Sequence, residues 1–269
     1  MVDFQCKQTY SYEDFLNIMR LLRAPGGCPW DREQTHGSIR RNFLEETYEV
    51  LDALDRDDAA DMCEELGDVL MQVVFHAIIE EERGRFTMAD VVDGVAKKMV
   101  YRHPHVFGGS LQADTSEQVL VNWEVLKKAE KGQDTTADAI ESVPHTLPAL
   151  WRAEKVQKKT AKAVFDWQDA ISALSKLEEE VRELREALES GKGPEAPHGI
   201  REELGDTLFM AAKVGQMTGV DPEDALHRAC DKFDARFRRV EQAADKPLSD
   251  YDEKELIALW INAKAQEQS

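Results

Sequence analysis

Apolar residues recur every three to four positions along most of the chain, which is the spacing of one buried face of an α-helix. In the first half this pattern predicts helices over residues 11–23, 37–54, 58–83, 87–102 and 116–131. In the second half it predicts helices over residues 148–163, 169–190, 199–218, 222–243 and 252–267. No stretch alternates between apolar and polar residues for long enough to predict a central strand. The pattern therefore predicts an all-α protein built of small helical bundles.

Capping residues mark the ends of several predicted helices. Thr87 is placed to cap the helix that follows it, and Gly84 to end the helix before it. Asp221 followed by Pro222 is a start signal, because Asp caps a helix and Pro fits the first helical position. The segment 24–36 is rich in Pro and Gly, so we expect it to be irregular.

The chain repeats its polar motifs in the same order and at nearly constant spacing. The run Glu-Glu-Thr-Tyr-Glu at 45–49 matches Glu-Glu-Val-Arg-Glu at 179–183, an offset of 134 residues. The run Glu-Glu-Leu-Gly-Asp at 64–68 recurs at 202–206, an offset of 138, so the connection 190–199 carries the extra length. We therefore predict two tandem homologous helical domains, an N-terminal domain of residues 1–133 and a C-terminal domain of residues 134–269.

Composition and charge narrow the class of protein. Of 269 residues, 42% are hydrophobic, which is enough for a packed core. The net charge of −19 argues against binding nucleic acid or an anionic membrane through a broad basic face. The four cysteines are widely spaced without a CxxC pair, and no targeting or membrane-spanning segment is evident, so we expect a cytoplasmic protein.

The repeated acidic motifs place carboxylates on shared helix faces. Residues three or four apart on a helix point to the same side, and a short loop makes consecutive helices antiparallel neighbours. The carboxylates that converge are Glu46, Glu49, Glu65 and Asp68 in the first copy and Glu180, Glu183, Glu203 and Asp206 in the second. Four converging carboxylates repel one another unless a hard divalent cation, Mg²⁺ or Mn²⁺, neutralises them. Gly67 and Gly205 lie inside the motifs, which indicates close approach of another backbone or of a ligand.

Each copy also offers two cations one helical turn apart, and a tryptophan followed one turn later by a lysine. These residues are Lys98, Arg102, Trp123 and Lys127 in the first copy and Lys232, Arg236, Trp260 and Lys264 in the second. Cations of this kind suit phosphate oxygens, and a tryptophan face suits a nucleobase. Carboxylates, a metal ion and cations together indicate phosphoryl transfer. The sequence contains no P-loop motif. These residues do not show which phosphorus atom is attacked.

The order of these motifs resembles the MazG family of the all-α NTP pyrophosphatase superfamily. The resemblance rests on the runs Cys-Pro-Trp-Asp at 28–31, Gln-Thr at 34–35, Leu-Glu-Glu-Thr-Tyr-Glu-Val at 44–50, Glu-Leu-Gly-Asp at 65–68 and Arg-His-Pro-His-Val-Phe at 102–107, and on the duplicated second half. It implies Mg²⁺-dependent hydrolysis of nucleoside triphosphates at the α-phosphorus, giving monophosphate and pyrophosphate. It also implies a homodimer of tandem helical domains.

The resemblance implies roles for individual residues. The metal ligands of the second copy would be Glu180, Glu183, Glu203 and Asp206, with Glu46, Glu49, Glu65 and Asp68 as their counterparts. The candidate substrate-binding residues are Lys176, Glu178, Glu179, Arg201, Glu202, Asp206, Lys232, Arg236, Trp260 and Lys264, with Lys98, Arg102 and Trp123 as counterparts. The candidate catalytic residues are Glu179, Glu202, Lys232 and Arg236. Either of the two glutamates is a candidate to orient or deprotonate the attacking water.

The two copies differ in charge beside the acidic motifs. Lys176 corresponds to Asn42, and Arg201 to Cys63, so the second copy has two additional cations, although arginines at 40–41 are candidates to compensate. We expect the second copy to hydrolyse ordinary triphosphates and the first to be weak, selective or mainly structural.

Two other classes of protein share part of this pattern. A di-iron carboxylate bundle needs Glu-x-x-His pairs on its helices, and only Glu33 and His36 have that spacing, in a loop and without a counterpart. An acidic helical metal-binding scaffold or regulatory interaction protein would use its glutamates for solubility. Failure to bind Mg²⁺ would favour that second alternative.

Overall fold

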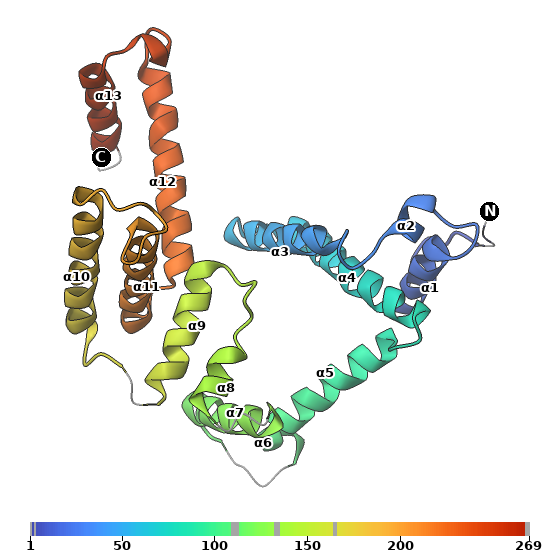
Figure 1. Cartoon of the computed structure of the whole chain (residues 1–269). Helices are drawn as coiled ribbons and strands as arrows, with labels where there is room; N and C mark the ends of the chain where they lie inside the picture. Colours follow the sequence, from blue (N-terminus) through green and yellow to red (C-terminus); the bar gives the residue numbers. More distant parts are fainter. Residues whose placement is uncertain (1, 3, 109–112, 132–134, 164–165, 267–269) are drawn as a thin grey trace. The chain divides into compact units, whose positions relative to one another are not determined.

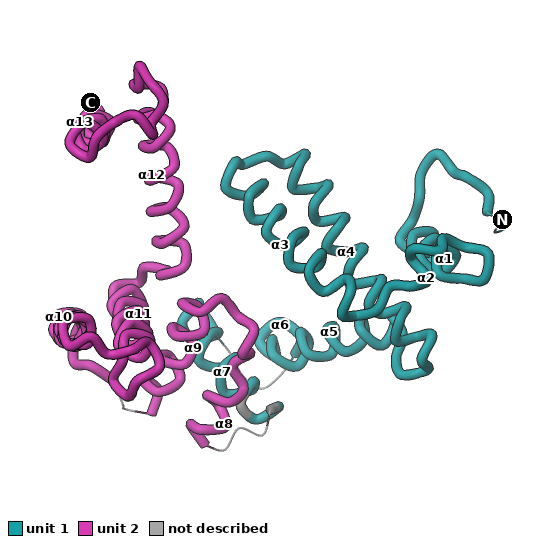
Figure 2. The backbone as a smooth tube through the Cα atoms, turned by 45° about the horizontal axis from the view of Figure 1, so that its top comes forward, with its two compact units in different colours: residues 1–130 teal, residues 131–269 magenta. Residues whose placement is uncertain are grey.

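The computed structural model describes residues 2, 4–108, 113–131, 135–163 and 166–266. Every regular element within these ranges is helical (Figure 1), so the all-α prediction is confirmed. The chain divides into two compact units, unit 1 with residues 1–130 and unit 2 with residues 131–269 (Figure 2). The predicted domain junction, between residues 133 and 134, lies outside the described residues and stays a prediction. No helix among the described residues has the length and hydropathy needed to cross a membrane.

The first half of the chain forms seven helices within its described residues. They are α1 (Tyr12–Arg23), α2 (Pro29–Glu33), α3 (Arg40–Asp55), α4 (Ala59–Glu82), α5 (Met88–Arg102), α6 (Pro104–Phe107) and α7 (Ser116–Lys131). The five predicted helices are present, with ends within three residues of those expected. Two short helices, α2 and α6, were not predicted. Each starts at a proline, which fits the first helical position because the N–H there makes no hydrogen bond within the helix. Because of α2, the segment 24–36 is less irregular than expected.

The second half repeats this organisation. Its elements are α8 (Thr136–Glu141), α9 (Ala149–Ala161), α10 (Ala170–Glu189), α11 (Ile200–Thr218), α12 (Pro222–Ala243), the 3₁₀-helix η1 (Leu248–Asp250) and α13 (Glu253–Ala265). The five predicted helices are again present. Helix α8, which was not predicted, starts with a capping box in which Thr135 and Asp138 each accept a backbone N–H of the other.

The predicted capping residues act as expected. The Thr87 hydroxyl accepts the backbone N–H of Asp90 at the start of α5. The Asp221 carboxylate accepts the backbone N–H groups of Glu223 and Asp224 at the start of α12. Gly84 follows the end of α4 with a φ of +67°, a left-handed conformation that favours glycine.

A helical hairpin is the centre of each unit. Helices α3 and α4 lie side by side and are joined by the turn 56–58, whereas α10 and α11 are joined by the longer loop 190–199 (Figure 1). Behind the first hairpin, α4 packs its apolar side against α1. The buried cluster there consists of Met19, Ile39, Val74, Phe75, Ala77, Ile78, Ile79 and Met88. This packing fixes one face of α4 and leaves the face toward α3 to the acidic residues.

Candidate functional site

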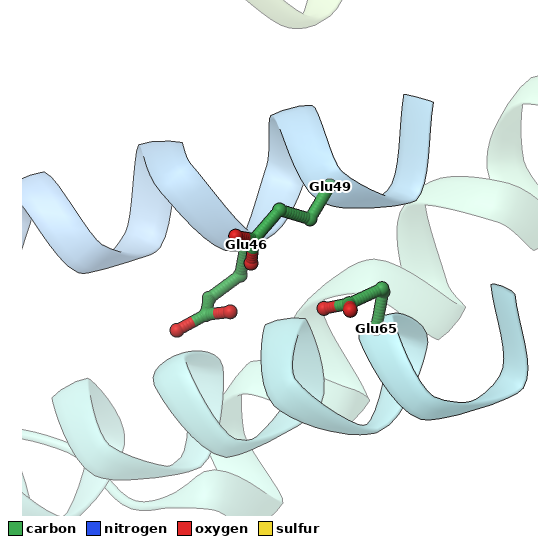
Figure 3. Close-up of side chains that lie close together, drawn as sticks. All are labelled: Glu46, Glu49 and Glu65. Atoms are coloured by element: carbon green, nitrogen blue, oxygen red, sulfur yellow. The ribbon is translucent and has the colours of Figure 1, made fainter. Parts of the chain in front are cut away.

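Three carboxylates converge between α3 and α4, and we call them the first acidic cluster. Glu46 and Glu49 come from α3 and Glu65 from α4, and one oxygen of each lies within 4.8 Å of the others (Figure 3). Burial is the main cause of a raised pKa at Glu46, and a hydrogen bond with Glu49 raises that pKa further. Burial and the charge of Glu49 likewise raise the pKa of Glu65. The charges of these carboxylates therefore oppose one another unless a proton or a cation compensates.

The corresponding carboxylates converge between α10 and α11, and we call them the second acidic cluster. Glu180, Glu203 and Asp206 each offer an oxygen within 4.8 Å of the others. Glu180 and Glu203 are buried, with 7% and 4% of their surface exposed, whereas Asp206 is exposed. Although much of the residue is exposed, partial desolvation of its carboxyl group, together with the charge of Glu180, raises the pKa of Asp206. A buried pair of acids needs a positively charged partner.

The two clusters share two equivalent members and differ in the third. Glu46 corresponds to Glu180 and Glu65 to Glu203, but the third oxygen comes from Glu49 in unit 1 and from Asp206 in unit 2. The remaining predicted members lie nearby. The charge of Asp68 contributes to raising the pKa of Glu46. Burial and then the charge of Glu180 raise the pKa of Glu183.

A lysine lies beside the second acidic cluster. The Lys176 Nζ is 2.9 Å from Glu180 Oε1 and 3.2 Å from Glu179 Oε1. The hydrogen bond with Glu180 raises the pKa of Lys176, which keeps its charge. His198 approaches Glu203, with 3.5 Å between Nδ1 and Oε1, a contact that we did not predict.

Two other predicted residues of this region have partners in the loop 190–199. Arg201 pairs with Glu195, with 2.7 Å between Arg201 Nε and Glu195 Oε1, rather than adding its charge directly to the acidic cluster. A carboxylate oxygen of Glu202 accepts the backbone N–H of His198 at 2.8 Å. Both residues thus connect α11 to the loop that precedes it.

The remaining predicted residues of unit 2 lie on α12 and α13. The Arg236 guanidinium lies over the Trp260 ring, 5.0 Å from its centroid, and Phe233 contacts the same ring. Lys232 belongs to α12 and Lys264 to α13. The acidic cluster is on a different pair of helices, so its union with these residues in one site stays a prediction.

The corresponding cation in unit 1 has an internal partner. Arg102 is buried, and its Nε and Nη2 donate to Glu130 Oε2 at 2.8 and 2.6 Å. The Arg102 guanidinium and the Lys127 ammonium also lie over the Trp123 ring, at 5.3 and 4.7 Å from its centroid. The sequence pattern marked Arg102 as a phosphate ligand and missed Glu130, which already neutralises it.

The mid-helix glycines do not mark a close contact between backbones. At Gly67 and at Gly205, no atom of another described segment lies within 4 Å of the position that a Cβ would occupy. The expected approach of a second backbone is therefore wrong within the described chain. The other expectation, approach of a ligand, stays a prediction.

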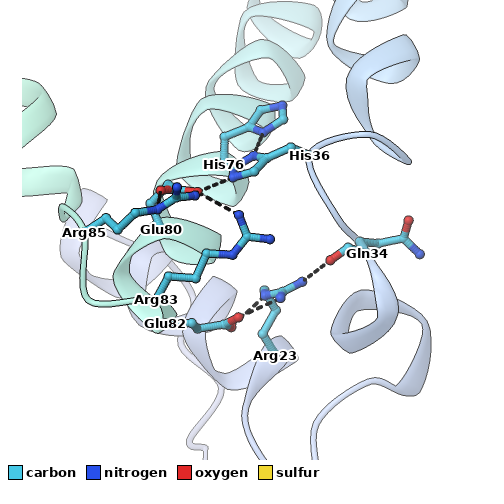
Figure 4. Close-up of polar contacts among 8 residues, drawn as sticks. All are labelled: Arg23, Gln34, His36, His76, Glu80, Glu82, Arg83 and Arg85. Atoms are coloured by element: carbon cyan, nitrogen blue, oxygen red, sulfur yellow. Dashed lines mark hydrogen bonds and ion pairs between the residues drawn. The ribbon is translucent and has the colours of Figure 1, made fainter.

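A separate polar cluster in unit 1 ties the segment before α3 to α4 (Figure 4). The side chain of Glu80 is 7% exposed and accepts hydrogen bonds from His36, Arg83 and Arg85. On its other side, His36 Nδ1 lies 2.7 Å from His76 Nδ1. Hydrogen bonds from Arg85 and His36 lower the pKa of Glu80 from 4.5 to about 2.

The lowered pKa of Glu80 predicts an acid-sensitive contribution to the stability of unit 1. Because the pKa is lower in the folded chain, ionised Glu80 stabilises the fold above pH 4.5, and this contribution is lost as the pH falls toward 2. We expect Glu80→Gln to be less stable than the wild type at pH 7, and the difference to shrink across that acid range. Urea unfolding at several pH values measures it. Glu64→Gln is the control, because Glu64 is an exposed residue of α4. Parallel curves for wild type and Glu80→Gln would contradict the prediction.

Comparison with known proteins gives two kinds of match. The model of the family described as the MazG nucleotide pyrophosphohydrolase domain matches residues 34–107 and again residues 168–240. A Thermotoga maritima protein named nucleoside triphosphate pyrophosphohydrolase/pyrophosphatase MazG is 39% identical over 256 residues, 94% of this chain and 95% of its own. The Escherichia coli K12 nucleoside triphosphate pyrophosphohydrolase is 41% identical over 94% of this chain and 96% of its own. The uncharacterised Bacillus subtilis protein YabN is 43% identical over 96% of this chain and 52% of its own.

Proposed function

The chain belongs to the MazG family, and from this premise we propose that it hydrolyses nucleoside triphosphates to monophosphate and pyrophosphate by attack of water at the α-phosphorus. The observation that carries the proposal is the second acidic cluster, in which Glu180, Glu203 and Asp206 bring carboxylate oxygens within 4.8 Å of one another. The names of the relatives supply the substrate class and the bond class, since they are nucleoside triphosphate pyrophosphohydrolases.

The donor set of both clusters fits Mg²⁺ or Mn²⁺. All of the converging atoms are carboxylate oxygens, which hard divalent cations prefer, and neither cluster contains a thiolate. The residues that would hold the metal are Glu180, Glu183, Glu203 and Asp206 in unit 2 and Glu46, Glu49, Glu65 and Asp68 in unit 1. When bound, the ion would neutralise part of the triphosphate charge and stabilise the charge that develops during the reaction.

Other side chains of unit 2 would bind the nucleotide and position the water. Lys232 and Arg236 would donate hydrogen bonds to phosphate oxygens, and Trp260 would offer a ring face to the base. Glu179 and Glu202 lie next to the buried acids in sequence without belonging to the group of three oxygens. Both are therefore candidates to orient or deprotonate the attacking water.

We place the main activity in unit 2. Lys176 stands beside the second acidic cluster, whereas the corresponding residue of unit 1 is the neutral Asn42. A triphosphate bound in unit 1 would therefore lack the lysine that unit 2 offers beside its acidic cluster.

The test is product analysis with a panel of nucleoside triphosphates and Mg²⁺. We expect monophosphate and pyrophosphate, complete loss of turnover with a chelator, and recovery when Mg²⁺ or Mn²⁺ is restored. Diphosphate and phosphate as products would contradict attack at the α-phosphorus. A folded protein that neither binds Mg²⁺ nor turns over any triphosphate would favour the acidic scaffold instead.

We also propose that the chain forms a homodimer. Apolar side chains remain exposed on the helices that carry the clusters and on those that follow them, including Leu54 at 52%, Leu66 at 50%, Val95 at 45% and Phe233 at 56%. Burying such surfaces against a second copy would stabilise helices that one chain leaves uncovered. Light scattering should then give twice the mass of the chain.

A further inference from the structure

We propose that Lys176 is a resident counter-ion of the second acidic cluster, so that free divalent metal binds the first cluster in preference to the second. The inference rests on the proposed metal role of both clusters and adds an order of binding to it. Metal would enter the second cluster together with the triphosphate, which offers the displaced ammonium group a new anionic partner.

The contact of Lys176 involves the same carboxylate that the metal would need. Its ammonium Nζ lies 2.9 Å from Oε1 of Glu180, which belongs to the second acidic cluster and is buried. The same ammonium group lies 3.2 Å from Glu179. A charge-assisted hydrogen bond to a buried carboxylate is stronger than an exposed ion pair, so a metal ion must displace a well-held competitor.

The first acidic cluster has no ammonium group at the equivalent position. Lys176 precedes Glu180 by four residues on α10, and Asn42 precedes Glu46 by four residues on α3. The two positions are therefore equivalent relative to the acid. Asn42 carries no charge. The adjacent Arg41 pairs with Glu45 at 2.7 Å, and Glu45 is not one of the three converging acids. The two clusters thus have similar donors but different competitors.

This difference has a direct consequence for binding order. A divalent ion entering the second cluster alone must break the contact between Lys176 and Glu180 and then remain near an unpaired ammonium group. A triphosphate removes that obstacle, because its oxygens can accept hydrogen bonds from the ammonium group. In the first cluster the equivalent position holds Asn42, so the ion has no ammonium group to displace there and needs no second ligand.

The test is a titration with Mn²⁺ alone, followed by electron paramagnetic resonance, which reports free ion and not turnover. Glu46→Gln with Glu49→Gln isolates the second cluster, and Glu180→Gln with Glu203→Gln isolates the first. We expect the first cluster to bind Mn²⁺ about tenfold more tightly. Lys176→Asn should tighten binding to the second cluster about tenfold, and Asn42→Lys should weaken binding to the first about tenfold.

A matched control separates the local contact from net charge. Lys158→Asn changes the net charge of the chain by the same amount as Lys176→Asn. It also removes a lysine that pairs with a glutamate four residues away on its own helix, Glu154 on α9. It should leave both affinities unchanged. If Lys176→Asn fails to fold by circular dichroism, Asn42→Lys alone decides the question.

The outcomes separate this inference from the proposed function. If the two clusters bind Mn²⁺ with equal affinity and neither Lys176→Asn nor Asn42→Lys changes it, the role of Lys176 is overturned. The metal sites themselves would remain. Absence of Mn²⁺ binding at either cluster in a folded protein would overturn the metal role itself, and the inference with it.

Discussion

Replacement of Glu180 by glutamine should lower kcat/KM for triphosphate hydrolysis by at least about 100-fold. Glu180 is buried, shares the second acidic cluster with Glu203 and Asp206, and holds Lys176. Glutamine keeps the shape of the side chain but removes the charge that the metal ion needs. The loss should therefore come from chemistry rather than from a cavity.

The matched control is the same substitution at the equivalent position of unit 1. Glu46→Gln should leave kcat/KM within about twofold of the wild type if unit 2 carries the activity. Thermal unfolding of both variants verifies that they are folded. The reverse result, with Glu46→Gln inactive and Glu180→Gln active, would move the activity to unit 1.

Alanine in place of Arg236 and of Arg102 should have different effects, although the two arginines are equivalent in sequence. Arg236→Ala should lower kcat/KM about 100-fold, because Arg236 is proposed to donate hydrogen bonds to the phosphate of the substrate. Arg102→Ala should lower the free energy of unfolding by about 1–3 kcal/mol, because Arg102 is buried and donates two hydrogen bonds to Glu130. Its turnover should stay within about twofold of the wild type.

Steady-state kinetics and urea unfolding on both variants test this contrast. Glu130→Gln provides a further control, since it weakens the same ion pair from the other side and should reproduce the stability loss of Arg102→Ala in part. Loss of turnover in Arg102→Ala at unchanged stability would instead show that unit 1 takes part in hydrolysis.

The helical architecture was predictable because apolar periodicity extends over long segments. Among the residues that the structure describes, ten helices of twelve or more residues carry that signal, and all ten were predicted. The short helices α2, α6 and α8 contain four to six residues each, which is too few for a periodic pattern. Their signals were local, a proline at the first position or a capping box.

The sequence predicted those parts of the candidate site that depend on residue spacing within one helix. The i, i+3 spacing and the repeat together located both acidic clusters. They did not show that Glu49 completes one cluster and Asp206 the other, because that choice depends on how the two helices of a hairpin are aligned and on side-chain rotamers. Glu130 lies 28 residues after Arg102, so no helical spacing connects them.

The difference between the two hairpin connections bears on how a duplicated chain folds without misassembly. The turn 56–58 holds Asp57 in a left-handed conformation with a φ of 53°, whereas the loop 190–199 is more than three times longer. Closing the shorter connection costs about 1 kcal/mol less in chain entropy. Unit 1 also leaves the ribosome first, so α3 pairs with α4 before α10 and α11 have been synthesised. The order of synthesis and the tight turn together disfavour exchange of helices between two hairpins of similar sequence.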